Sequence, residues 1–171
     1  MVKPHNFLNT LTAIPAMKRI ALFAFSCCLI GFASHYAKAQ SKPNIRLNHI
    51  AVYVHDLKTS TNFYENVLQL EQIPEPFHDG LHTWFTLGDA GQLHLIQGAP
   101  QNVKRDKNDH LCFSVESIED FIAHLDKHKV NYSNWPGTAK APTVRPDGVK
   151  QIYFQDPDGH WIEVNNDKLG R

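Results

Sequence analysis

Three histidines and one glutamate occupy matching places in two similar stretches of this chain. They are His49, His94, His110 and Glu163. Each stands in a short run with apolar residues at alternate positions, such as LHL around His94, and this alternation predicts a strand with one apolar and one polar face. Imidazole nitrogens and a carboxylate oxygen together suit a divalent transition-metal ion. The fold has to bring the four side chains together before that chemistry can operate.

The sequence repeats its own plan, and the repeat relates the four residues in pairs. His49 in NHIAVYV aligns with His110 in DHLCFSV, 61 positions later. His94 in QLHLI aligns with Glu163 in HWIEV, 69 positions later, and the loops absorb the difference. A lone histidine in such a strand is more often an ordinary polar residue on a half-solvated sheet face. Four polar residues in equivalent strands of a duplicated sequence favour a metal site instead.

Each half of the repeat predicts a strand, a helix and then a run of strands that ends in a hairpin. Asp56 and Ser117 are the expected N-caps of the two helices, and residues 118–125 have the apolar spacing of an amphipathic helix. The segment 156–159, Asp-Pro-Asp-Gly, has the residues that a type I turn favours. Because the helices need an apolar partner, we expect them on the apolar faces of the strands. The four site residues then project from the opposite, concave face, where they converge if the two halves curl together.

Residues 1–39 differ in character from the rest of the chain. An apolar run over residues 20–33 follows the basic pair Lys18-Arg19 and precedes Ala37-Lys38-Ala39, as in a secretory signal peptide. The run is shorter than the roughly 20 residues of a membrane span. We therefore expect an export signal, with residues 1–16 either an upstream extension of it or a stretch that precedes a true start at Met17.

Cleavage of that signal would leave residues 40–171, with a net charge of −4 in place of the neutral balance of the whole chain. Only Cys112 would remain of the three cysteines, so no disulfide could form within the chain. We expect this part to be periplasmic or secreted, with no membrane attachment after cleavage. A nucleic-acid partner is not expected either, because the composition offers no concentrated basic face.

The strands and turns together resemble the vicinal oxygen chelate superfamily, which includes glyoxalase I, methylmalonyl-CoA epimerase, extradiol dioxygenases and the fosfomycin-resistance thiol transferases. The resemblance extends from about Leu47 to Asn165 and is carried by NHIAVYV, FYENVLQL, QLHLI, DHLCFSV and the DPDG turn before WIEV. It implies an α+β fold in which two βαβββ modules, about 46–98 and 108–166, form one curled mixed sheet around a metal site, with the helices on the outer face. Residues 40–171 would then be a single domain.

Carried onto this chain, the superfamily's metal ligands are His49, His94, His110 and Glu163, the same four residues. Glyoxalase I usually has glutamate where this chain has His94, so Glu163 is the carboxylate left to transfer a proton. The resemblance implies a metal-dependent lyase or isomerase of the glyoxalase type, with enediolate chemistry on a small molecule that carries vicinal oxygens. Glu163 would be its catalytic residue, and the cofactor one divalent ion of Zn, Ni, Fe or Mn.

Three alternatives remain open at this stage. An iron- or manganese-dependent dioxygenase would use His49, His110 and Glu163 as its ligands, with His94 behind them. A metal-dependent thiol transferase would open an epoxide, and a non-catalytic member would hold a small ligand between the modules. Some members exchange modules between subunits, so a homodimer is a further expectation.

Other polar and aromatic residues are candidates for the substrate pocket. Tyr153, Trp161 and Asn165 share the predicted face of Glu163, although simple packing would explain the aromatic pair equally well. Arg145 lies in a Pro- and Gly-rich loop, where it could clamp an anionic substrate or stay exposed. His124 and His128 lie four residues apart on the second predicted helix, and we expect them to be solvated or beside its apolar stripe rather than ligands.

Overall fold

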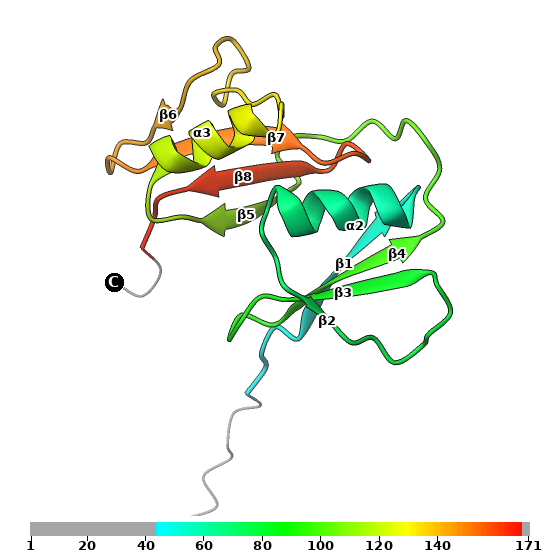
Figure 1. Ribbon diagram of the computed structural model, residues 1–171. Helices are drawn as coiled ribbons and strands as arrows, with labels where there is room; N and C mark the ends of the chain where they lie inside the picture. The colour runs from blue at the N-terminus through cyan, green and yellow to red at the C-terminus, as the bar shows by residue number, and fades with distance from the viewer. Residues whose placement is uncertain (1–43, 169–171) are drawn as a thin grey trace, which may run out of the picture. The chain divides into compact units, whose positions relative to one another are not determined.

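Two modules of the same design follow one another along the chain (Figure 1). The computed structural model describes residues 44–168. The first module contains β1 (His49–Val54), α2 (Leu57–Asn66), β2 (Gln72–Ile73), β3 (His82–Thr86) and β4 (Gln92–Gln97). The second contains β5 (His110–Ser114), α3 (Ile118–Lys127), β6 (Thr143–Val144), β7 (Lys150–Gln155) and β8 (Trp161–Asn165). The expected α+β fold with two βαβββ modules is confirmed. The expected export signal lies outside the described residues and stays a prediction.

The strands of each module pair only with one another among the described residues. The strand orders are β1-β4-β3-β2 and β5-β8-β7-β6, so each module forms its own four-stranded mixed sheet. The first and last strands of each module are parallel neighbours, with Ala51 opposite His94 in one sheet and Cys112 opposite Glu163 in the other. The two sheets do not close into the single curled sheet that the resemblance implied. The duplicated sequence is therefore a duplicated structure whose halves remain separate sheets.

Both helices begin where the sequence predicts. Asp56 accepts a hydrogen bond from Thr59 N at 2.6 Å, and this bond lowers the pKa of the Asp56 carboxyl. Ser117 accepts one from Asp120 N at 3.1 Å. Each cap satisfies a backbone N–H that the first turn of a helix leaves without an internal partner.

One hydrophobic core is shared by the two modules. The apolar residues of β1, β3 and β4 and those of β7 and β8 belong to the same buried cluster as those of the helices. Phe63 on α2 packs against Phe154 on β7, with ring centroids 6.3 Å apart. Because the apolar faces of both sheets contribute to this core, their polar faces both point away from it.

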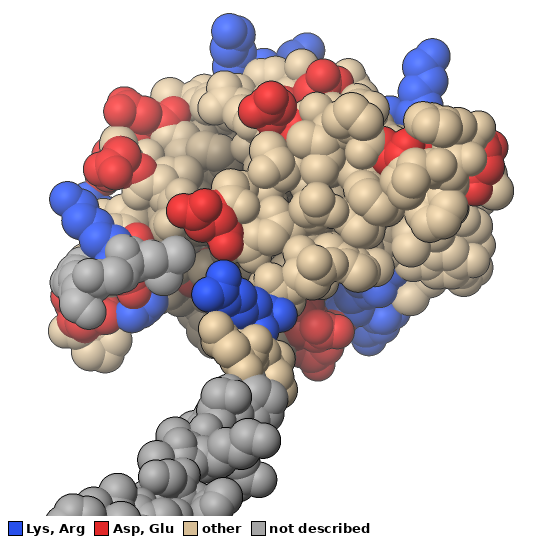
Figure 2. Space-filling model, turned by 90° about the horizontal axis from the view of Figure 1, so that it is seen from below, with Lys and Arg blue, Asp and Glu red and all other residues tan. Residues whose placement is uncertain are grey.

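The surface carries charges of both signs. Figure 2 shows acidic and basic side chains interspersed on the face that it displays, without a large field of either sign. Within residues 44–168, no helix is long and apolar enough to cross a membrane.

Candidate metal centre

His49 and His94 form a stacked pair on the polar face of the first sheet. Their strands are parallel neighbours, and their rings lie with centroids 4.3 Å apart and planes at 8°. The ring of Trp84, directly opposite His94 on β3, stacks on the other side of His94 at 3.9 Å. His94 is 8% exposed, and burial lowers its pKa, with a smaller effect from the neighbouring His49. This environment favours the neutral imidazole, which is the form that binds metals.

Hydrogen bonds assign one nitrogen of each of these two rings as a donor. His49 Nδ1 lies 2.7 Å from Asn48 Oδ1, and His94 Nε2 lies 2.8 Å from Gln92 Oε1. Because an amide oxygen only accepts, each of these nitrogens carries the proton. In the neutral ring the other nitrogen is then an acceptor, Nε2 in His49 and Nδ1 in His94, and is able to bind a metal ion.

His110 and Glu163 form the corresponding pair on the second sheet. His110 Nε2 lies 3.4 Å from Glu163 Oε2. His110 Nδ1 donates to the backbone oxygen of Lys107 at 2.8 Å, so that Nε2 is again the acceptor in the neutral ring. Both side chains are partly or wholly buried, with Glu163 only 7% exposed.

Three neighbours hold the carboxylate of Glu163 in one orientation. Tyr153 OH donates to Oε2 at 2.5 Å, and Asn165 Nδ2 donates to Oε1 at 2.8 Å. The thiol of Cys112 also lies against Oε1, at 3.4 Å. Burial raises the pKa of Glu163, but the hydrogen bonds from Tyr153, Asn165 and Cys112 lower it more, and the net direction is downward. Partial desolvation of the Cys112 thiol and the adjacent Glu163 carboxylate raise its pKa to about 12, which keeps it a neutral thiol at physiological pH.

The two pairs do not meet within one chain. Among residues 44–168, no group of three or more His, Cys, Asp or Glu side chains lies close enough together to hold a metal ion. Each sheet therefore presents half of the predicted ligand set, as two residues on its first and last strands.

The chemistry of each half nevertheless fits a divalent ion. Each imidazole is anchored through one nitrogen to a carbonyl oxygen, as metal-binding histidines usually are, and the carboxylate is anchored by hydrogen bonds. Trp84 Nε1 is buried beside His94 without a hydrogen-bond partner among the described residues. A buried donor of this kind is usually satisfied by ordered water or by a bound group, so it is compatible with a ligand on this face.

Comparisons with known proteins identify the family of this chain. The family model of the Glyoxalase/Bleomycin resistance protein/Dioxygenase superfamily matches residues 46–164. The chain belongs to this superfamily. It is 30% identical over 132 residues to the metallothiol transferase FosB of Staphylococcus epidermidis, covering 72% of this chain and 82% of that protein. It is 28% identical over 129 residues to glyoxylase I 4 of Arabidopsis thaliana, covering 70% of each.

Solved structures show the same fold. The crystal structure of a glyoxalase/dioxygenase from Nostoc punctiforme matches 72% of this chain and 91% of its own length, with a TM-score of 0.59 and 23% identity. The lactoylglutathione lyase of Agrobacterium tumefaciens matches 75% of this chain and 98% of its own, with a TM-score of 0.57 and 22% identity. The resemblance to the superfamily that was inferred from the sequence is confirmed.

The residues predicted to bind substrate have defined partners in this member of the superfamily. Tyr153 and Asn165 both donate to Glu163, and Trp161 Nε1 donates to the backbone oxygen of Arg105 at 3.3 Å. Tyr153 and Trp161 also line a cavity of about 490 Å³. Arg145 is paired with Asp147 at 2.6 Å and Asp167 at 3.4 Å, and these carboxylates raise its pKa. A substrate carboxylate would have to compete with both of them for the guanidinium of Arg145.

His124 on α3 and His128, the C-cap residue of that helix, have structural contacts in the described fold. His124 Nε2 lies 3.2 Å from the backbone oxygen of Asn66 and 3.1 Å from that of Val67. These carbonyls end α2, so His124 satisfies acceptors that the last turn of a helix leaves open. His128 packs against the His124 ring, with centroids 4.4 Å apart.

Several residues around the two pairs were missed in the sequence. Gln92 and Trp84 could have been found, because Gln92 shares the strand face of His94 and Trp84 faces His94 once the β3–β4 register is known. Cys112 lies on the same face as Glu163 by the alternation of β5. The contact of Lys107 with His110 could not be predicted from the sequence, because it depends on the path of a loop.

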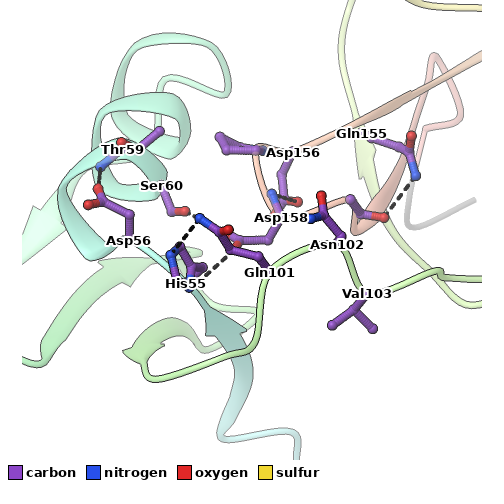
Figure 3. A pocket seen from close by; sticks show the side chains of 12 residues that line it. His55, Asp56, Thr59, Ser60, Gln101, Asn102, Val103, Gln155, Asp156 and Asp158 are labelled. Atoms are coloured by element: carbon purple, nitrogen blue, oxygen red, sulfur yellow. Dashed lines mark hydrogen bonds between the residues drawn. The ribbon is translucent and has the colours of Figure 1, made fainter.

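A separate polar cavity of about 700 Å³ lies between the start of α2 and the 156–159 turn (Figure 3). Asp158 is part of its wall and accepts hydrogen bonds from His55 N at 2.6 Å and from Ser60 Oγ at 2.7 Å. Gln101 Nε2 lies 2.9 Å from Nε2 of the His55 ring. None of the predicted metal ligands or substrate residues lines this cavity.

Proposed function

We propose that this chain is a divalent-metal enzyme of the glyoxalase type, acting as a lyase or isomerase on a small molecule with vicinal oxygens. The proposal is carried by the two matching half-sites. His49 and His94 on one sheet, and His110 and Glu163 on the other, each present metal-binding atoms that hydrogen bonds have already oriented.

We further propose that two copies of the chain complete each site. The apolar faces of both sheets pack into one shared core, so the two half-sites point away from it and could meet within one chain only if that core came apart. In a two-fold dimer the first half-site of one copy can face the second half-site of its partner, and symmetry then makes two equal sites. Four ligands would surround each ion, as in the ligand set that the sequence predicts.

Within such a site the roles of the side chains follow from their contacts. A bound divalent ion acts as a Lewis acid on the substrate oxygens. Glu163 would accept the proton from the adjacent substrate carbon at Oε2, the oxygen that takes the hydrogen bond from Tyr153. Trp161, close to the same pair, would provide an apolar wall for the substrate.

A second candidate is a metal-dependent thiol transferase. Both oxygens of Glu163 accept hydrogen bonds, which suits a fixed ligand better than a base that must move. The identity to FosB supports the same reaction class. In that case Glu163 would serve only as a ligand. The thiol sulfur would bond to an epoxide carbon as that C–O bond breaks, and the thiol proton would pass to the epoxide oxygen that is released.

Metal analysis of two variants, alone and mixed, tests the shared site. We expect the purified wild type to hold about one zinc, nickel, iron or manganese ion per chain, and His49→Ala and Glu163→Ala each to lose most of it. When the two variants are unfolded, mixed and refolded together, mixed dimers carry one site with all four native ligands. About a quarter of all sites should then regain metal for random two-fold pairing. Recovery no greater than in the separately refolded variants would contradict a site shared between copies.

The reaction class is tested on the metal-loaded protein. Exchange of substrate carbon-bound hydrogen with deuterated water, over a panel of hemithioacetals and 2-substituted acyl thioesters, is expected for the lyase or isomerase and should be lost in Glu163→Gln. Consumption of a thiol together with an epoxide, with no such exchange, would replace it by the transferase. A metal-loaded protein with neither activity would support a binding protein and contradict both reactions.

A further inference from the structure

The ammonium group of Lys107 is enclosed by the second module. Its Nζ lies 4.5 Å from the ring centroid of Trp161, 5.2 Å from that of Tyr153 and 5.9 Å from that of Trp135. It also donates to the backbone oxygens of Trp135 at 3.0 Å and Asn134 at 3.4 Å. Three aromatic faces and two carbonyl dipoles attract a cation at this point. They act against the desolvation that lowers the pKa of Lys107. The side chain is therefore anchored, although it belongs to a segment in which most residues are exposed.

The backbone of the same lysine contacts the predicted metal site. Its carbonyl oxygen accepts from His110 Nδ1 at 2.8 Å. Trp161, one of the three rings, donates its Nε1 to the carbonyl of Arg105, two residues earlier. The segment between the modules is thus attached to the second sheet beside His110. Within this described segment, Lys107 contacts the aromatic rings through its side chain and His110 through its backbone oxygen.

We propose that Lys107 is a positioning residue for His110. Its caged ammonium group fixes the place of its own carbonyl oxygen, which in turn holds the proton of His110 on Nδ1 and directs Nε2 toward Glu163 Oε2, 3.4 Å away. The inference rests on the proposed function only in taking His110 as a metal ligand. The effect on the histidine itself exists in the metal-free protein and can be measured there.

The first test is the tautomer of His110 in the metal-free chain. Nitrogen-15 NMR of the imidazoles at pH 8 should show His110 protonated at Nδ1 in the wild type. In Lys107→Met we expect a smaller population of the Nδ1-protonated tautomer and a detectable population of the Nε2-protonated tautomer. Lys107→Arg, which keeps a cation in the cage, should restore the wild-type signals, a rescue that a merely structural loss would not show. Lys104→Met, at an exposed lysine of the same segment, is the matched control.

The second test is zinc binding by competition with a coloured chelator. Loss of groups that orient metal ligands commonly weakens binding about 10- to 100-fold, so Lys107→Met should bind zinc about tenfold more weakly, and Lys104→Met should equal the wild type. Trp135→Leu removes one ring but keeps the carbonyl that Lys107 binds, and should lie between them. If Lys107→Met does not fold, the zinc affinity of Trp135→Leu tests the proposal in its place.

The two proposals fail separately. A wild type that binds no zinc would remove the proposed function, and the tautomer would still report on Lys107. The role of Lys107 would be overturned, with the metal site intact, by a second result. In that case the wild type binds zinc, Lys107→Met binds it with an affinity within twofold, and His110 keeps its Nδ1 proton equally in both proteins.

Discussion

Tyr153 and Glu163 offer the sharpest test at the level of single residues. The Tyr153 hydroxyl donates to Glu163 Oε2 at 2.5 Å, while its ring faces Trp135 and Lys107. Tyr153→Phe keeps the ring and removes the donor, so we expect folding to be retained and zinc affinity to fall about tenfold. Chelator competition measures the change. Tyr132→Phe, whose ring lies under Lys140, is the control, and equal affinities for both variants and the wild type would show that Glu163 needs no support from Tyr153.

The residues of the site were predictable from the sequence to different degrees. Strand alternation and the internal repeat place His49 beside His94, and His110 beside Glu163, and the structure has both pairs. The partners that orient them could not be derived in the same way. The contact from Lys107 to His110 depends on how a loop returns to a strand end, and alternation carries no information about loops.

At the level of elements, Gly91 determines how closely β4 approaches the start of β1. Its φ is +117°, and a Cβ there would lie 2.5 Å from the backbone oxygen of Asn48, next to His49. Gly91→Ala should therefore destabilise the fold by about 2 kcal/mol or more, through both strain and collision. Gly80→Ala, with φ of +73° and open space around its Cβ, carries the strain alone and should cost about 1 kcal/mol. Urea unfolding measures both, and equal losses would show that the approach to Asn48 can relax.

The 156–159 turn is a second element whose role can be isolated. Asp158 accepts from His55 N and from the buried hydroxyl of Ser60, so it fastens the second module to the start of α2. Asp158→Ala would leave that hydroxyl without its partner, and we expect a loss of about 2 kcal/mol in the free energy of unfolding. Asp89→Ala, in an exposed turn of the first module, should change it little. A loss no larger than that of Asp89→Ala would mean that the contacts of Asp158 contribute little to joining the modules.

The elements themselves were predictable where local chemistry decides them. Both N-caps and the strands that carry the site residues stand where the sequence predicts. The two-residue strands β2 and β6 carry no such pattern, since a pair of residues is too short for alternation to show. They exist because the neighbouring strand offers them hydrogen bonds, which is tertiary information.

For the whole molecule, the sequence predicted four convergent residues and the structure has two separate pairs. The alternation of apolar and polar residues shows which side chains share a face of one sheet, because it depends on which side of a strand is apolar. This alternation does not show whether the polar face of one module meets the other module of its own chain or that of a second copy. In residues 44–168 both polar faces lie away from the shared apolar core. The proposed dimer would bring the two pairs together.

The same shared core predicts how the molecule responds to alkali. Tyr64 on α2 is fully buried and donates to Asp156 Oδ2 at 3.0 Å, which joins the two modules inside the core. Burial and the Asp156 charge raise its pKa well above the ordinary value of about 10. The unfolded chain therefore releases this proton first, and the stability that the neutral phenol contributes is complete below about pH 10 and is lost as the pH rises beyond it.

Urea unfolding between pH 8 and 11 measures the effect of Tyr64. Above about pH 10 the wild type should lose stability more steeply than Tyr64→Phe, by about 1.4 kcal/mol per pH unit. At pH 8 the variant should be only about 1 kcal/mol less stable, the net worth of one hydrogen bond. Tyr53→Phe, at a half-exposed tyrosine of β1, should keep the wild-type slope. If Tyr64→Phe keeps it too, the phenol of Tyr64 reaches solvent without opening the core, and the modules are then joined less tightly than the contact with Asp156 implies.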